Sequence, residues 1–131
     1  MKILKRKTLL WFYLISLVVL AIIPINSGKF SMNDIYIVSF RLDYLAHSIV
    51  FLPWMMFYLG MPIFVFKKPI PLLGWIFFGL SYAALTEGIQ FFLSYRSFNI
   101  NDLIANALGI ALSILLYTFI KIFGLRLINK V

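Results

Sequence analysis

Four long apolar segments, separated by short polar connections, dominate the hydrophobic pattern of the chain. They run over residues 8–25, 44–66, 70–93 and 103–122. Each is close to the roughly 20 apolar residues that a helix needs to cross a bilayer, so each predicts a membrane-spanning helix. The 131 residues have room for these four helices and their connections, and none for a separate soluble domain. We therefore expect one all-α domain, residues 1–131, built as an integral membrane four-helix bundle.

Proline and polar residues mark the ends and breaks of these segments. Pro53 lies inside the second segment, and the helical hydrogen bond that it removes predicts a kink there. Pro69 and Pro71 open the third segment, where the first helical turn tolerates a missing N–H. Asn101 or Asp102 is the expected N-cap of the fourth segment, because either side chain can accept a hydrogen bond from a free helical N–H.

The third and fourth segments each carry small residues at a spacing of four. Gly79, Ala83 and Glu87 share one helical face, and small residues there allow another helix to approach closely. We therefore expect Glu87 to face protein and not lipid. The same spacing recurs in the fourth segment, at Ala105, Gly109 and Ser113. These faces are also compatible with a homo-oligomer.

Composition supports the membrane interpretation. Hydrophobic residues make up 63% of the chain and the mean hydropathy is +1.01, whereas only about half of a soluble domain is apolar. The net charge of +8 would suggest nucleic acid as a partner of a soluble protein. Here the basic residues cluster between and beyond the apolar segments, as topology signals do, so we expect no nucleic-acid partner. The absence of cysteine excludes disulfides and thiolate nucleophiles.

The basic residues also predict the orientation of the helices. Nine of the twelve lysines and arginines fall at the two termini and in the connection after the second segment. The positive-inside rule then places both termini in the cytoplasm, and the connections over residues 26–43 and 94–102 outside, in a multi-pass protein of the plasma membrane. A basic start before an apolar run is also typical of a signal peptide. The run is long, lacks Ala-x-Ala and has Pro24 near its end, so we expect an uncleaved first helix.

Paired polar residues lie at the same predicted end of three helices. Three of the four acidic residues and the only histidine fall in this layer. The pairs are Asp43 with His47, Glu87 with Gln90, and Asp102 with Asn106, and Arg96 lies in the connection before the last pair. Members of a pair are three or four positions apart, so they share one helical face. Acids within a bilayer usually face the bundle interior, so we predict that these groups meet, with Arg96, His47 and Gln90 as candidate partners of Glu87.

The order and spacing of these residues resemble the VanZ-like family of small bacterial membrane proteins. The matching stretch, from Arg41 to Gly109, reads Asp43-x-x-x-His47, Glu87-x-x-Gln90 followed by Arg96, and Asp102-x-x-x-Asn106-x-x-Gly109. Tyr44 stands where lysine is common in the family, so no role of that lysine is carried over. The resemblance implies an envelope protein with a site on the outer face. The naming member is linked to low-level resistance to teicoplanin, a glycopeptide that binds cell-wall precursors outside the membrane.

We favour a binding or accessory function at this outer face. The protein would hold an anionic lipid or a lipid-linked cell-wall precursor and so contribute to teicoplanin resistance or cell-envelope homeostasis. Arginine forks match phosphate oxygens in pairs, which suits Arg96 to such a ligand. Gln90 and Asn106 complete the expected ligand-binding residues.

A membrane enzyme acting on a lipid phosphate head group is the alternative. Its candidate catalytic residues are Asp43, His47, Glu87 and Asp102. Their carboxylates would suit Mg²⁺ or Ca²⁺ better than zinc, and His47 could instead act as a general acid or base. A small proton-coupled exporter ranks below both, because such exporters typically keep their key acid in the middle of the first helix, which has none here.

Overall fold

The computed structural model describes residues 2–24, 35–37, 40–60, 71–96 and 98–128. Nearly all of these residues are helical: α1 (Lys2–Ile22), α2 (Leu42–Phe51), α3 (Trp54–Gly60), α4 (Leu72–Phe91) and α5 (Ile100–Ile128). The predicted helical architecture is thus confirmed. Two short strands, β1 (Tyr36–Ile37) and β2 (Phe40–Arg41), pair antiparallel before α2, inside a connection whose sequence pattern does not predict them. The rest of that connection, residues 25–34 and 38–39, lies outside the described residues.

The kink predicted at Pro53 is a complete break between α2 and α3. A residue with an N–H at this position would donate to the carbonyl of Ile49, one turn earlier. That carbonyl accepts instead from the N–H of Leu52, at 3.1 Å, which tightens the last turn of α2. The chain restarts as α3, where the N–H of Met56 donates to the carbonyl of Pro53 at 3.0 Å. The second predicted segment is therefore two helices; its residues 61–66 lie outside the described residues.

The third and fourth predicted segments are α4 and α5, with shifted ends. Pro71 is the N-cap of α4, in extended conformation, while Pro69 lies outside the described residues. The helix α5 extends beyond the predicted 103–122 at both ends, over Ile100–Ile128. An apolar window ends at the first polar residues, whereas a helix can continue through them, as α5 does at Asn101 and Lys121.

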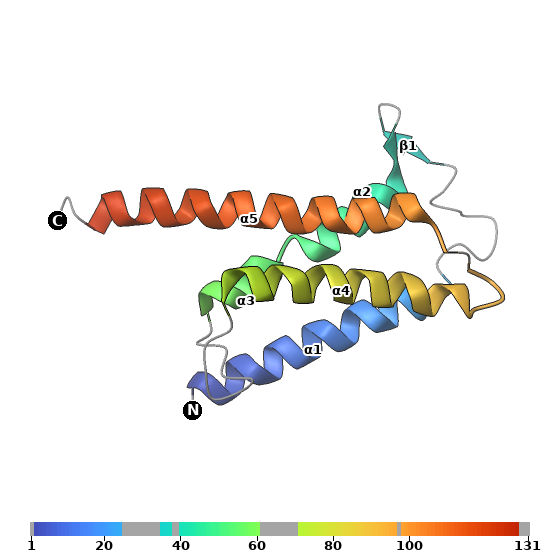
Figure 1. The fold of residues 1–131 in the computed structure, drawn as a ribbon, viewed down its shortest axis with the longest axis horizontal. Coiled ribbons are helices and arrows are strands. Elements are labelled where there is room, and N and C mark those ends of the chain that lie inside the picture. The colour runs from blue at the N-terminus through green and yellow to red at the C-terminus, as the bar shows by residue number, and fades with distance from the viewer. Residues whose placement is uncertain (1, 25–34, 38–39, 61–70, 97, 129–131) are drawn as a thin grey trace.

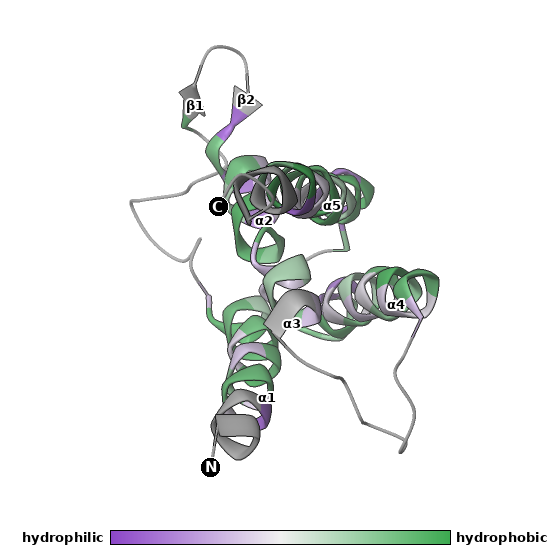
Figure 2. Ribbon diagram, turned by 90° about the vertical axis from the view of Figure 1, so that its left-hand side faces the viewer, coloured by the Kyte–Doolittle hydropathy of each residue, from purple (hydrophilic) through white to green (hydrophobic). Residues whose placement is uncertain are grey.

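The helices run up and down as an antiparallel bundle (Figure 1). The start of α1 and the end of α5 lie at one end, and the end of α1 and the connection from α4 to α5 lie at the other, which we call the distal end. The helix α5 packs against α2, α3 and α4, while α1 packs against α4. Viewed along the bundle, α2 and α3 lie between α1 and α5, and the short strands project beyond the helices (Figure 2). Both termini therefore share one side, as the predicted orientation requires.

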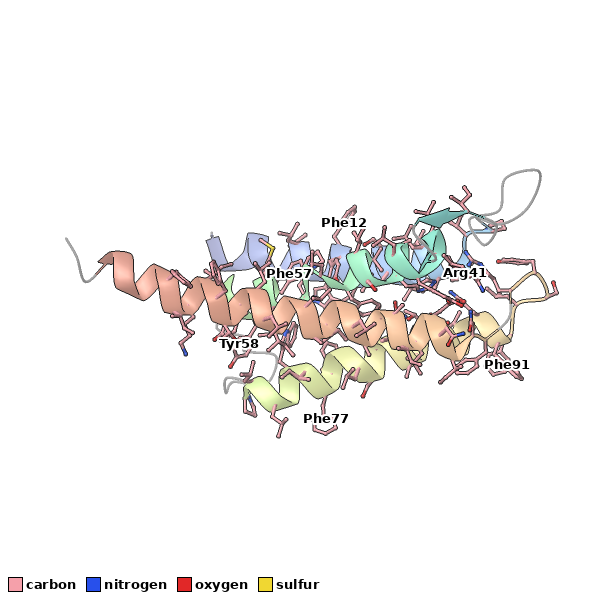
Figure 3. The ribbon with its side chains drawn as sticks, turned by 90° about the horizontal axis from the view of Figure 1, so that it is seen from above. Phe12, Arg41, Phe57, Tyr58, Phe77 and Phe91 are labelled. Carbon is pink, nitrogen blue, oxygen red and sulfur yellow. The ribbon has the colours of Figure 1, made fainter. Side chains whose placement is uncertain are left out.

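Apolar side chains cover the outside of the bundle. Phe12, Phe77 and Phe91 point outward from α1 and α4 (Figure 3). Among the described residues two helical stretches, Leu72–Phe91 and Ile100–Phe123, are long and apolar enough to cross a membrane, and only 28% of each is buried. A core helix of a soluble protein would be mostly buried, so these exposed faces point to lipid contact.

Stacked aromatic rings fill the centre of the bundle. Trp54 of α3 and Trp75 of α4 are fully buried and stack with ring centroids 4.8 Å apart. Each indole N–H donates to the backbone carbonyl of the other tryptophan, at 3.2 and 3.3 Å. Gly79 leaves room for this pair, since a Cβ there would lie 2.7 Å from the Trp54 ring. The pair therefore fixes how α3 sits on α4.

Two tyrosine hydroxyls attach α1 to the rest of the bundle. Tyr13 donates to the carbonyl of Val50 in α2, and Tyr82 of α4 donates to the carbonyl of Leu14, both at 2.7 Å. We expect Tyr82→Phe to lower the free energy of unfolding by about 0.5–1.5 kcal/mol, the net contribution of one hydrogen bond. Thermal denaturation in detergent checks this value. Tyr117→Phe is the control, because the Tyr117 hydroxyl makes no hydrogen bond to a described residue; an equal loss there would contradict the explanation.

The predicted small-residue faces are the surfaces along which the helices meet. Gly79, Ala83 and Glu87 are all buried, so the prediction that Glu87 faces protein is confirmed. The face of Ala105, Gly109 and Ser113 is buried as well. On this second face the Ser48 hydroxyl donates to the carbonyl of Ala105 at 2.9 Å, so the backbones of α2 and α5 lie close together. This close approach brings the polar side chains of the two helices within reach of each other.

Candidate functional site

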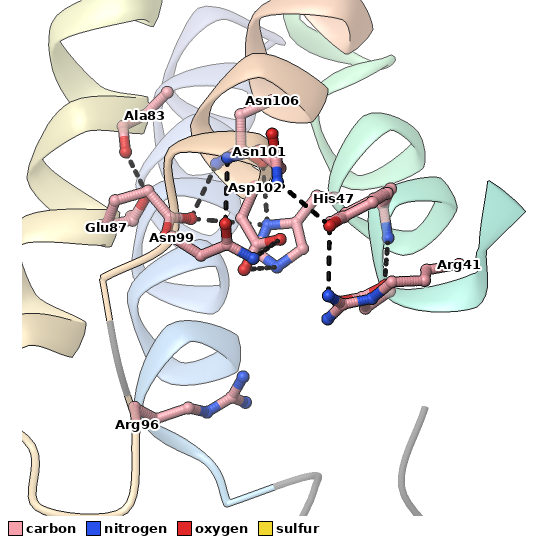
Figure 4. A network of polar contacts seen from close by, with 12 residues as sticks. Arg41, His47, Ala83, Glu87, Arg96, Asn99, Asn101, Asp102 and Asn106 are labelled. Atoms are coloured by element: carbon pink, nitrogen blue, oxygen red, sulfur yellow. Dashed lines mark hydrogen bonds and ion pairs between the residues drawn. The ribbon is translucent and has the colours of Figure 1, made fainter. Parts of the chain in front are cut away.

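Polar side chains from α2, α4 and α5 meet at the distal end of the bundle (Figure 4). We call this group the distal cluster; its members are His47, Glu87, Asn99, Asp102 and Asn106. The prediction that the three polar faces meet is therefore confirmed for His47, Glu87, Asp102 and Asn106. All of these residues except Asn99, which directly precedes α5, lie on helices packed against one another, so the bundle itself sets their positions.

His47 is the centre of the distal cluster. Its Nδ1 lies 3.1 Å from the Asn106 carbonyl oxygen Oδ1 and 3.5 Å from Glu87 Oε1. Its Nε2 lies 3.8 Å from Asp102 Oδ2. The imidazole is thus placed between two carboxylates, one on each neighbouring helix.

Glu87 is the most deeply buried acid of the cluster, with no exposed surface. Its Oε1 accepts a hydrogen bond from the Asn106 amide nitrogen at 3.1 Å. Its Oε2 has no hydrogen-bond partner within the described residues. Buried polar atoms normally have partners, so an orphan oxygen in a cluster of this kind is a feature typical of functional sites.

Asp102 faces His47 because another residue caps α5. The helix begins at Ile100, and the Asn99 side chain accepts a hydrogen bond from the N–H of Asn101 at 3.0 Å. The prediction that Asn101 or Asp102 is the N-cap is therefore wrong. The apolar pattern starts only at Leu103, so it placed the helix start too late. Asn99 also donates its amide to Asp102 Oδ1 at 3.0 Å, which holds that carboxylate toward the cluster.

Asp43 makes its contacts with residues at the start of its own helix, including Arg41 at the end of β2. The Arg41 guanidinium forms an ion pair with both carboxylate oxygens of Asp43 and stacks over the Tyr44 ring. The hydrogen bond to Asp43 raises the pKa of Arg41 above its ordinary value. Asp43 Oδ1 also accepts from the N–H of Tyr44 at 2.9 Å. Asp43 thus lies beside the cluster without a direct bond to His47, and Arg41 is a participant that the spacing of acids did not indicate.

Gln90 and Arg96 stand apart from the cluster. Gln90 is buried one turn after Glu87, and no described residue forms a hydrogen bond with its amide. Arg96 donates to the carbonyl of Ile23 at 2.7 Å, and its neighbour Tyr95 donates to that of Ile22 at 2.8 Å. The end of α1 is therefore capped by the connection after α4. Of the three candidate partners of Glu87, only His47 contacts it.

The described residues contain no group of three or more histidines and acids that could hold a metal ion. The geometry explains this, because Glu87 and Asp102 approach opposite nitrogens of the His47 ring and do not converge on one point. A site for Mg²⁺ or Ca²⁺ stays a prediction without support from the arrangement.

Comparison with known proteins agrees with the resemblance in the motifs. The family model described as VanZ/LLP1 matches residues 9–121, which include the whole distal cluster, all of α2, α3 and α4, and most of α1 and α5. No curated protein and no solved structure matches the chain significantly.

Proposed function

Because this chain belongs to the VanZ-like family, we propose that it is a multi-pass plasma-membrane protein that contributes to glycopeptide resistance or cell-envelope homeostasis. The function is binding or modification of a lipid-linked or surface ligand at the outer face of the membrane. The proposed ligand is an anionic lipid or a lipid-linked cell-wall precursor.

The observation that carries this proposal is the distal cluster itself. An imidazole, two carboxylates and two amides lie together at one end of a bundle whose described helices expose many large apolar side chains. Polar groups in such surroundings are expensive, and they usually mark a ligand or ion pathway. Among the members of the cluster, helix capping explains Asn99 alone.

Two further observations support an outward-facing site. The distal end is opposite the termini, and the basic residues favour a cytoplasmic location of the termini. The distal end then faces the wall, where glycopeptides bind cell-wall precursors.

Teicoplanin susceptibility tests the proposal. A sensitive Gram-positive host expressing the wild type should tolerate more teicoplanin than the host alone. Glu87→Gln and Asp102→Asn remove one negative charge each while keeping the side-chain shape, so we expect both to abolish this protection. The measurement is the minimal inhibitory concentration at matched membrane abundance of each variant.

Asn101→Ala is the matched control on the same helix. The Asn101 side chain is exposed, contacts the Tyr44 hydroxyl and does not touch His47, so the variant should protect as well as the wild type. Equal protection by all variants would show that the distal cluster is structural. No protection by the wild type would overturn the resistance role.

A further inference from the structure

The two ring nitrogens of His47 have different surroundings. Nδ1 faces inward and lies at hydrogen-bond distance from Asn106 Oδ1, 3.1 Å. Nε2 makes an ion-pair contact of 3.8 Å with Asp102 and has no hydrogen bond to a described residue. Nε2 is therefore the ring nitrogen that has no hydrogen bond to a described residue and can accept a proton.

The direction of the Asn106 amide determines where the histidine proton lies. The amide nitrogen donates to Glu87 Oε1, because a carboxylate oxygen accepts hydrogen bonds. The amide oxygen must then face His47, and an oxygen acceptor requires an N–H on Nδ1. Glu87 thus acts on His47 both through Asn106 and directly, since its Oε1 lies 3.5 Å from Nδ1, and both contacts favour the first ring proton on Nδ1.

The exposed fraction of the side chains increases from Glu87 and Asn106 toward His47 and Asp102. Glu87 and Asn106 are almost fully buried, while the His47 side chain is 18% exposed and that of Asp102 is 11% exposed. The orienting groups are inside the bundle, and the Nε2 edge of the ring, together with Asp102, is nearer to the surface.

We propose that the distal cluster is a proton-exchange site whose exchanging atom is Nε2 of His47, with Glu87 and Asn106 as positioning residues. A ligand hydroxyl or a phosphate monoester gives its proton to the Nε2 lone pair and keeps the electron pair on its oxygen. The resulting imidazolium lies between the carboxylates of Glu87 and Asp102, which balance its charge. The proton returns by the reverse step.

The inference rests on the proposed function in one respect only: the side of the membrane from which a ligand reaches His47. The position of the proton on the ring can be measured without ligand and without a resistance phenotype. The two proposals can therefore fail separately.

Nitrogen NMR of the ¹⁵N-histidine-labelled full chain in lipid vesicles tests the inference. His47 is the only histidine, so the spectrum needs no assignment. In the neutral ring we expect the Nδ1–H tautomer to dominate, although free histidine in water favours Nε2–H. A wild-type ring that is mainly Nε2–H would overturn the proposal, whatever the variants do.

Asn106→Ala removes the nearer acceptor at Nδ1 and leaves only the longer 3.5 Å contact with Glu87 Oε1, so its ring should shift toward the Nε2–H form. Asn101→Ala, one turn earlier on α5 and away from His47, should keep the wild-type tautomer. Asp102→Asn should also keep it, because the new amide can donate to the Nε2 lone pair. A persistent Nδ1–H form in Asn106→Ala, or a change in Asn101→Ala, would contradict the role of Asn106.

Discussion

Replacing Gly109 by alanine should separate α2 from α5 and dismantle the distal cluster, although glycine carries no polar group. A Cβ at this position would collide with the Ser48 carbonyl oxygen and lie 3.0 Å from the Ser48 Cα. These are backbone atoms, so no side-chain rotation can relieve the collision. We expect the free energy of unfolding to fall by about 1–3 kcal/mol, the usual effect of an overpacked interior. Thermal denaturation in detergent measures this loss.

The same substitution should also affect the site. His47 directly precedes Ser48, so a shift of α2 away from α5 lengthens the contact between His47 and Asn106. The Ser48 hydroxyl would lose its bond to the carbonyl of Ala105 in the same movement. We therefore expect Gly109→Ala to lose the Nδ1–H tautomer of His47 together with stability.

Gly88→Ala is the matched control for this prediction. A Cβ at Gly88 meets nothing within 4 Å, and the residue lies inside α4. Alanine is the better helix former by up to about 1 kcal/mol, so this variant should be as stable as the wild type or more stable. If both glycine variants lose stability equally, close packing at Gly109 is not the reason.

Trp54→Ala should have the largest effect on stability. The indole is fully buried, stacks on Trp75 and donates to its carbonyl. Its removal leaves a cavity where α3, α4 and the Tyr13 ring of α1 now meet. Truncation of a buried tryptophan costs about 3–5 kcal/mol. Lipid tails are as apolar as the core, so most of the loss would come from packing and the hydrogen bond. Thermal denaturation in detergent again measures the change.

Trp11→Ala is the control that distinguishes the loss of core packing from the loss of a tryptophan elsewhere in the protein. The Trp11 side chain is 64% exposed on α1, so its truncation opens no cavity inside the bundle. We expect this variant to denature close to the wild-type temperature. A comparable loss in both variants would show that the Trp54–Trp75 pair does not hold the bundle together.

The distal cluster shows which features of the site helical periodicity can predict. The spacing of Asp102 and Asn106 places both on one face of α5, and the contacts of both with His47 follow that spacing. The same rule places Glu87 on the face of Gly79 and Ala83, which is buried. These predictions hold because the local geometry of one helix determines which residues share a face.

The contacts between elements required the tertiary structure. Arg96 was expected near Glu87, yet it caps the end of α1, because the connection after α4 passes over that end. Asn99 caps α5, where the sequence predicts Asn101 or Asp102, since about one extra turn of helix precedes the apolar run. Such contacts depend on where the chain enters a helix, which hydropathy does not encode.

By itself the sequence determined the apolar helices, an interruption at Pro53 that it predicted as a kink, the small-residue faces and the polar layer at one end. Each of these follows from interactions within one helix or from the apolar character of a segment. Only the tertiary structure decided that His47 lies between two carboxylates and that Asn106 links it to Glu87. Those relations depend on the rotation and depth of α2, α4 and α5 against one another, which close packing at residues such as Gly109 sets.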